Sequence, residues 1–246
     1  RNINENLEAG KKSVLVTGLL ETQRADMSAY LLRNGTRHAI VAHSDAEAQK
    51  LHRSLIKKGI KSLFIQSDEI GFYSVEAKDR KSEAELVESL YRLSCNDYDI
   101  AVFSPDSLMK KYIPGEIITG SSQEIAYGEV LDKNQLIEKL INSGYVREHK
   151  VEGIGQFSMR GGIIDIFTPG TENPLRIELF DDEVDSIRTF DIFTQKSIEK
   201  IKKVNILPAR SFIYPQDLTK AVSDIQSDIS KDTSEDISFD LERIKN

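Results

Sequence analysis

The sequence predicts an α/β protein in two parts: a first unit built on a parallel sheet, and a second, α+β unit rich in antiparallel strands. In the first half of the chain, short apolar runs alternate with amphipathic helical segments, which is the order that gives a parallel sheet. After about residue 120 the pattern changes to one helix followed by short β-rich runs between turns of glycine, proline and aspartate. With 246 residues, the chain is long enough to bury two such cores.

The first unit is expected to contain four strands with helices between them. The apolar runs that predict the strands are residues 14–17, 38–42, 62–65 and 99–103. The amphipathic segments that predict helices are residues 25–32, 45–58 and 82–93. The second of these helices has clear end signals, because Ser44 or Asp45 can cap its start and Gly59 can end it.

The second unit is expected to begin with a helix at residues 133–142, where Leu136 and Leu140 lie on one apolar face. Six β-rich runs follow and fit an antiparallel meander: residues 145–151, 156–159, 162–167, 175–180, 184–190 and 201–206. From residue 208 the chain becomes polar and acidic, and the apolar spacing over 218–229 predicts a last helix that packs back on the first unit. Residues 231–240 have the composition of a solvated connector.

Composition and charge limit the classes of function. The net charge of −7 argues against non-specific nucleic-acid binding by this chain alone, since such binding needs a positive face. The single cysteine, Cys95, excludes an internal disulfide and a cysteine-based zinc site, and we expect it to be a small core residue. The four histidines lack the spacing of a metal site, so we expect no catalytic residues, metals or cofactors. No apolar run approaches the ~20 residues of a membrane span, which predicts a cytoplasmic protein without a membrane partner.

The seven residues from Val16 to Thr22 look like a phosphate-binding loop without its chemistry. They lie between a predicted strand and a predicted helix, as such loops do, and they include Gly18 and Thr22. Leu20 and Glu21 stand where a working loop needs a glycine and a lysine, and the Glu21 carboxylate would repel a triphosphate. These residues alone leave two interpretations open: an ordinary strand-to-helix turn, or a lapsed nucleotide site. Neither predicts nucleotide hydrolysis.

The most informative segment is residues 144–190, because arginine, aromatic residues and glycine are concentrated there. Arg160 is followed by two glycines, which leaves a guanidinium beside bare backbone and suits the binding of a partner's carboxylates. Arginine and aromatic residues are also enriched at protein interfaces. The alternative is that Arg160 and Arg176 pair internally with Asp165 and Glu178 across neighbouring strands. The residues alone leave both possibilities open.

The same segment resembles the N-terminal region of the bacterial transcription-repair coupling factors. The resemblance covers nearly the whole chain and is most specific from residue 144 to the run Leu207-Pro208-Ala209. It implies a degenerate helicase-like lobe, similar to that of the repair helicase UvrB, with an inserted domain that binds the repair protein UvrA. The implied domains are residues 1–120 for the lobe, 121–206 for the inserted domain, and 207–246 for the return to the lobe and the start of a linker.

The resemblance also bears on the loop at residues 16–22. This loop aligns with the UvrB pattern without gaps, with Leu20 in place of a glycine and Glu21 in place of the lysine, which favours a lapsed nucleotide site. A UvrB-type protein inserts a tyrosine-rich hairpin between DNA strands, and here only Gly71-Phe72-Tyr73 stands near that place. Damage verification by such a hairpin is therefore not expected.

The resemblance further implies a UvrA-binding site. Arg147 and Arg160 match arginines of the shared pattern, while Ser158 departs from a third arginine. The arginines would supply charged contacts, the phenylalanines apolar anchors or local core, and the glycines close backbone approach. The residues expected at this site are Arg147, Phe157, Arg160, Gly161, Gly162 and Phe167.

The function implied by the resemblance is that of an adaptor. This chain would recruit UvrA, while RNA polymerase and duplex DNA would be engaged by the rest of a longer protein, whose ATP-driven motor is absent from the sequence. One alternative is a UvrB-type nucleotide-dependent DNA-binding protein. Another is a DNA-binding module without enzymatic activity, which would bind duplex DNA in a strongly salt-dependent manner.

Overall fold

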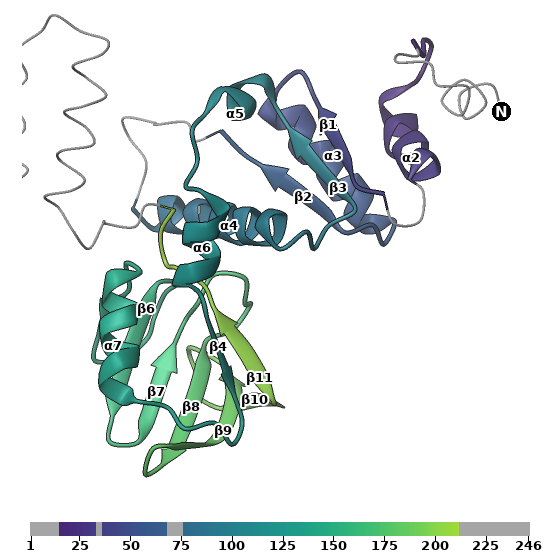
Figure 1. Cartoon of the computed structure of the whole chain (residues 1–246). Helices are drawn as coiled ribbons and strands as arrows, with labels where there is room; N and C mark the ends of the chain where they lie inside the picture. The colour runs from purple at the N-terminus through teal and green to yellow at the C-terminus, as the bar shows by residue number, and fades with distance from the viewer. Residues whose placement is uncertain (1–14, 33–35, 68–75, 212–246) are drawn as a thin grey trace, which may run out of the picture. The chain divides into compact units, whose positions relative to one another are not determined.

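The computed structural model describes residues 15–32, 36–67 and 76–211, with the backbone alone at 76–79. The chain divides into two compact units after Ser122 (Figure 1), and each unit is described by itself. One unit contains a parallel sheet and the other an antiparallel one, which confirms the predicted fold class. The expected elements at 71–73, 218–229 and 231–240 lie outside the described residues.

The first unit is built on a parallel sheet of three strands in the order β1-β3-β2. The strands are β1 (His38–Val41), β2 (Ser62–Ile65) and β3 (Ile100–Phe103). They pair in register, so that His38 and Ser62 both lie beside Ile100. All three strands lie where the apolar runs predicted them. The runs of β2 and β3 are mostly buried, as is usual in a parallel sheet, whereas the edge strand β1 alternates half-buried and exposed residues.

Helices pack on both faces of this sheet. The helices of this unit are α2 (Glu21–Leu31), α3 (Asp45–Lys57), α4 (Glu76–Ser94), α5 (Pro105–Met109) and α6 (Gly115–Ser121). Helices α2 and α3 share one apolar cluster with Ile100 and Val102, whereas α4 and α6 share another with Ile65. The end signals of α3 are confirmed, because Ser44 caps its start through its side chain and Gly59 follows its end with φ of +78°.

Two expectations for the first unit are wrong. Of the strand predicted at 14–17, residues 15–17 are described and form no strand, and Leu15 is 89% exposed. No strand among the described residues lies beside them to share backbone hydrogen bonds, and an apolar run without such a neighbour does not make a strand. Cys95 is exposed, because it lies past the last turn of α4 and off the buried stripe of Leu86 and Leu90.

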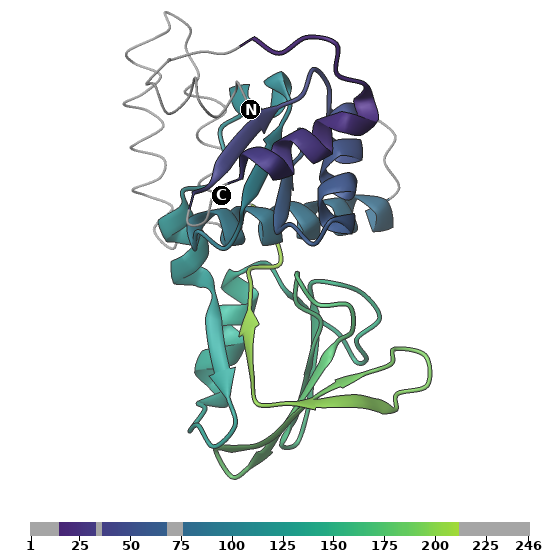
Figure 2. The same ribbon diagram turned by 90° about the vertical axis from the view of Figure 1, so that its right-hand side faces the viewer.

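The second unit combines helix α7 (Lys133–Asn142) with a six-stranded sheet in the order β10-β9-β8-β7-β6-β5. Figure 2 shows the ribbon of this unit turned by 90° from the view of Figure 1. Its strands are β5 (Val146–Arg147), β6 (Gln156–Arg160), β7 (Ile163–Ile166), β8 (Leu175–Phe180), β9 (Glu183–Phe190) and β10 (Ser197–Ile201). A separate pair of strands joins β4 (Gln123–Ala126) to β11 (Lys203–Ile206). Leu136 and Leu140 of α7 pack with Phe157 and Ile164 of the sheet in one apolar core.

The predicted meander is present from β6 to β10, where consecutive strands are antiparallel. It differs from the expectation at both ends. The strand predicted at 145–151 pairs only over two residues, and it runs parallel to β6. The strand predicted at 201–206 corresponds to β11, which pairs with β4 instead of the large sheet, whereas β10, the last strand of the meander, lies mostly before the predicted run.

Candidate functional site

Arg147 and Arg160 lie at the same edge of the six-stranded sheet. Arg147 ends the edge strand β5, and Arg160 ends its neighbour β6. Both side chains are exposed, and within the part of the chain that the structure describes neither makes a hydrogen bond or an ion pair. Two positive charges therefore remain available to a partner at this edge.

The register of the sheet shows how these two arginines are related. Arg147 lies beside Phe157, three residues before Arg160, so the two backbone positions are about 11 Å apart. Paired residues point to the same face of a sheet and successive residues alternate, so the two side chains leave the sheet on opposite faces. A partner that contacts both arginines must therefore cover the edge of the sheet rather than one face.

Arg176, in contrast, forms an ion pair within the sheet. Its guanidinium donates hydrogen bonds of 2.7 and 2.8 Å to the two carboxylate oxygens of Asp165. These hydrogen bonds raise the pKa of Arg176. Glu178 pairs with Arg188. Of the internal pairs that the sequence left open, the one between Arg176 and Asp165 is present, while none for Arg160 is found among the described residues.

The two glycines after Arg160 differ in the reason why glycine is needed. Gly161 has φ of +60°, in the left-handed region that glycine adopts without strain, and a Cβ there would meet nothing within 4 Å. Gly162 lies against β8: its carbonyl accepts a hydrogen bond of 2.8 Å from the Leu179 N–H. A Cβ at Gly162 would lie 2.8 Å from the Leu179 carbonyl oxygen. The close backbone approach expected at Gly162 is thus made within the sheet itself.

The two phenylalanines expected at the partner site belong to the core. Phe157 is 0% exposed and Phe167 is 7% exposed. Of the two roles expected for them, apolar anchor or local core, the structure shows the second, because a ring covered by its own fold cannot contact a partner. Ser158 is also buried, at 2% exposed. Residue type alone could not separate these roles, since aromatic residues are enriched both in cores and at interfaces.

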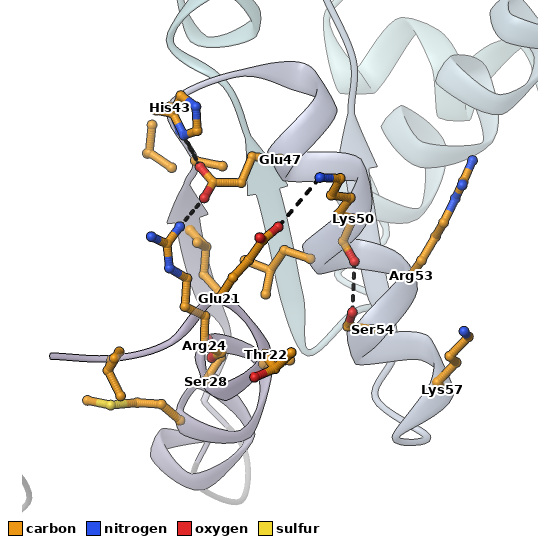
Figure 3. A pocket seen from close by; sticks show the side chains of 17 residues that line it. Glu21, Thr22, Arg24, Ser28, His43, Glu47, Lys50, Arg53, Ser54 and Lys57 are labelled. Atoms are coloured by element: carbon orange, nitrogen blue, oxygen red, sulfur yellow. Dashed lines mark hydrogen bonds and ion pairs between the residues drawn. The ribbon is translucent and has the colours of Figure 1, made fainter.

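The loop at residues 16–22, for which the resemblance favours a lapsed nucleotide site, lies beside a groove (Figure 3). Gly18 has φ of +80°, Leu20 is the N-cap residue of α2, and Glu21 and Thr22 begin the helix. The groove has a volume of about 850 Å³, and its walls come from α2, β1 and α3. Figure 3 shows Glu21 and Lys50 pointing toward one another, with 3.6 Å between the carboxylate and the ammonium.

Helix α2 is joined to the α3 segment by three ion pairs: Glu21 with Lys50, Arg24 with Glu47, and Asp26 with Lys58. Glu47 also accepts hydrogen bonds from the backbone N–H and the ring of His43. Partial burial would raise the pKa of Glu47, but the hydrogen bonds from His43 and the charge of Arg24 hold that pKa below its ordinary value. Sequence periodicity missed these pairs, because it carries no signal for partners on different helices.

This arrangement does not reproduce a working phosphate site. A phosphate-binding loop needs a lysine whose charge is free for the nucleotide, whereas here Glu21 holds that place and pairs with Lys50. Within the described ranges, no three His, Cys, Asp or Glu side chains are grouped so that they could hold a metal ion. Of the helices that the structure describes, none has the length and apolar character needed to cross a membrane.

Comparison with known proteins adds to this picture. Residues 124–212 match the family described as UvrB interaction domain. The chain is 34% identical over 239 residues to the transcription-repair-coupling factor of Bacillus subtilis (strain 168). It is 32% identical over 224 residues to that of Staphylococcus aureus (strain Mu50). These matches cover 92% and 87% of this chain but 20% and 19% of the relatives, so the chain spans about a fifth of their length. The resemblance found in the sequence is thereby confirmed: the chain is related to the bacterial transcription-repair-coupling factors, and residues 124–212 match the UvrB interaction domain family.

Proposed function

We propose that this chain is an adaptor module of a transcription-repair coupling factor, and that it recruits the nucleotide-excision-repair protein UvrA to stalled RNA polymerase. The observation that carries the proposal is the pair of exposed arginines, Arg147 and Arg160, within the segment that matches the UvrB interaction domain. Neither has a charged partner among the described residues. A guanidinium can bind a carboxylate through two parallel hydrogen bonds, which gives both strength and orientation to a contact with an acidic patch.

The neighbouring arginines support this assignment by contrast. Arg176 and Arg188 are paired with Asp165 and Glu178 inside the sheet. To contact a partner they would first have to break an ion pair of the fold, and a partly buried carboxylate would be left without its charge partner. Arginines at the open edge carry no such cost, so they are the ones we assign to UvrA.

The module would act by recognition and would not hydrolyse nucleotide. Glu21 takes the place of the phosphate-binding lysine and pairs with Lys50, which supports this part of the proposal. RNA polymerase and duplex DNA would be bound by parts of the longer protein outside this chain, where the ATP-driven motor would also reside. The setting would be the bacterial cytoplasm.

A binding titration of this chain against purified UvrA tests the proposal. The double variant Arg147→Ala, Arg160→Ala should weaken binding by about tenfold or more, as truncation of charged hot-spot residues commonly does. The matched control is Arg53→Ala, Lys57→Ala, which removes two exposed positive charges from α3 and should change the affinity by about twofold at most.

Thermal melting of each variant shows whether the fold is intact. Full affinity in the arginine variant would mean that these two side chains are not the binding site. If the unaltered, folded chain has no affinity for UvrA, the adaptor proposal is wrong.

One observation favours a second function, the nucleotide-dependent DNA binding of a UvrB-type protein: Lys50 brings a positive charge to the lapsed loop. Titration with magnesium ATP separates the two functions. We expect no saturable binding at millimolar ATP, because Glu21 repels the phosphates that Lys50 would attract. Measurable affinity that is lost on magnesium removal would instead support the second function.

A further inference from the structure

Exposed apolar side chains lie beside Arg160 at one end of the six-stranded sheet. Ile163 is 40% exposed, Phe180 is 76% exposed and Val130 is 76% exposed. They come from three different segments: the start of β7, the end of β8 and the turn before α7. An exposed phenylalanine surrounded by other apolar residues is uncommon on a surface that only water covers.

Strand register places these side chains on one face of the sheet. Arg160 pairs with Ile163. Ile163 in turn pairs on β8 with Glu178, two residues before Phe180. Phe180 pairs with Glu183, the first residue of β9, and Glu183 forms an isolated bridge with Val130. The exposed carboxylate of Glu183 therefore lies on this face between the two apolar side chains. Paired residues, and residues two apart in one strand, point to the same face. The pairing of β8 with β9 shifts register between Glu178 and Leu179, but the extra residue, Asp185, lies on β9, so the alternation along β8 is unbroken. All four side chains therefore share that face at the same end of the sheet.

Farther along the strands, residues on the same face are buried. Ser158, Asp165 and Phe190 point to it as well, by the same alternation, and they are 2%, 4% and 0% exposed. Arg176 covers part of that region, with its guanidinium 4.4 Å from the centre of the Phe190 ring. Exposure on this face is thus concentrated at the end that carries Phe180.

Arg160 has no carboxylate partner on this face among the described residues. The Glu178 carboxylate accepts hydrogen bonds from Arg188 and from the Ser186 hydroxyl, the latter at 2.9 Å. Asp165 is taken by Arg176. The carboxylates nearest to Arg160 on the face are therefore already occupied within the sheet, and a partner's carboxylate is what its guanidinium can still bind.

We propose that Arg160, Ile163, Phe180 and Val130 form one docking surface, here named the Phe180 surface, with the ring of Phe180 as its apolar anchor. The inference rests on the proposed function and names UvrA as the occupant. We expect the facing surface of UvrA to be apolar opposite Phe180 and to carry a carboxylate for Arg160. Arginine beside a large apolar side chain is the composition of an interface hot spot. Phe180 thereby takes the anchor role that the buried Phe157 cannot fill.

The test compares two exposed phenylalanines in the UvrA titration. Phe180→Ala should weaken binding by about tenfold or more, because it removes the anchor of the interface. The matched control is Phe193→Ala: Phe193 is 89% exposed and follows the opposite end of β9, so its loss should change the affinity by about twofold at most. Phe180→Leu, which keeps an apolar side chain, should lose less than Phe180→Ala. Equal melting temperatures would show that all three variants fold.

The outcomes separate this inference from the proposed function. If Phe180→Ala binds UvrA like the unaltered chain while the Arg147 and Arg160 variant does not, the Phe180 surface is wrong and the adaptor function stands. Equal losses in Phe180→Ala and Phe193→Ala would also overturn it. Sedimentation of the chain alone tests whether a second copy of the chain binds this surface instead. If the chain is a dimer that Phe180→Ala dissociates, and the affinity for UvrA is unchanged, the surface is a dimer interface. Absence of UvrA binding by the unaltered chain would overturn both proposals.

Discussion

The groove of the first unit and the β5 and β6 edge of the second unit both carry several charges, but the charges are used differently. Around the groove, Glu21, Arg24 and Asp26 are each paired with a residue of the α3 segment. At the sheet edge, Arg147 and Arg160 have no such partner among the described residues. Charges that are paired within a unit hold its elements together, whereas an exposed unpaired arginine adds little to stability and is free to recognise a partner.

The second unit by itself also contains both paired and unpaired arginines. Arg176 and Arg160 lie on one face of the same sheet, yet one is paired with a buried carboxylate and the other is open. The difference follows from register: Asp165 lies directly opposite Arg176, whereas Ile163 lies opposite Arg160. Which arginine serves the fold and which can serve a partner is thus decided by the residue across the strand pair.

The largest expected effect tests the paired side of the comparison. Asp165→Ala would leave the Arg176 guanidinium without its carboxylate at a position where Asp165 is only 4% exposed. Breaking a buried pair costs about 3–5 kcal/mol, and we expect about 3 kcal/mol because 20% of the Arg176 side chain reaches solvent. Chemical denaturation measures this loss in the free energy of unfolding. Arg160→Ala is the control and should cost less than about 0.5 kcal/mol. Similar losses in both variants would remove the distinction between a paired and an open arginine.

Local patterns were sufficient to predict much of the fold. Strands β2 and β8 and helix α7 have the bounds that the sequence predicted, because each depends on the periodicity of its own residues. The run at 15–17 is the counter-example, since a strand also needs a neighbour, and its own residues cannot supply one.

The candidate site was predictable only in part. Residue type and resemblance singled out Arg147 and Arg160, and both are exposed at one edge of the sheet. Neither could show that Phe157 is buried or that Phe180 is exposed, because an aromatic ring in a strand is equally suited to a core and to an interface. The covering of each face depends on elements distant in the sequence, and no local pattern contains that information.

Substitutions at the two glycines should have effects of intermediate size on stability. Gly162 packs closely against β8, whereas Gly161 has open space around it. A Cβ in Gly162→Ala would press on the Leu179 carbonyl oxygen, so strands β7 and β8 must shift at a cost of about 2 kcal/mol. Gly161→Ala has open space around its Cβ, and strain at φ of +60° should cost about 1 kcal/mol. Denaturant titrations of both variants provide the comparison. If Gly162→Ala is as stable as the unaltered chain, the sheet accommodates the methyl group. The close contact between Gly162 and the Leu179 carbonyl would then not explain why glycine is present there.

The smallest effect tests whether paired charges hold α2 on the first unit. Helix α2 has Ala25 as its buried residue, so its ion pairs to the α3 segment should contribute much of its attachment. Arg24→Ala should cost less than about 1 kcal/mol, because the Arg24 side chain is 49% exposed to water and salt. Since the pKa of Glu47 is lowered in the folded state, its contribution is fully present above the ordinary value of 4.5 and is lost as the pH falls through the folded pKa.

Hydrogen exchange of the α2 backbone amides measures this attachment directly. Protection should fall in Arg24→Ala near neutral pH, and in the unaltered chain below about pH 4.5 after correction for intrinsic rates. Asp97→Ala is the control, because it removes an ion pair with Lys61 elsewhere in the first unit and should leave α2 unchanged. Unaltered protection in Arg24→Ala would show that apolar contact at Ala25 holds the helix. The paired charges of the groove would then be as dispensable to the fold as the open arginines of the edge, and pairing would no longer distinguish the two regions.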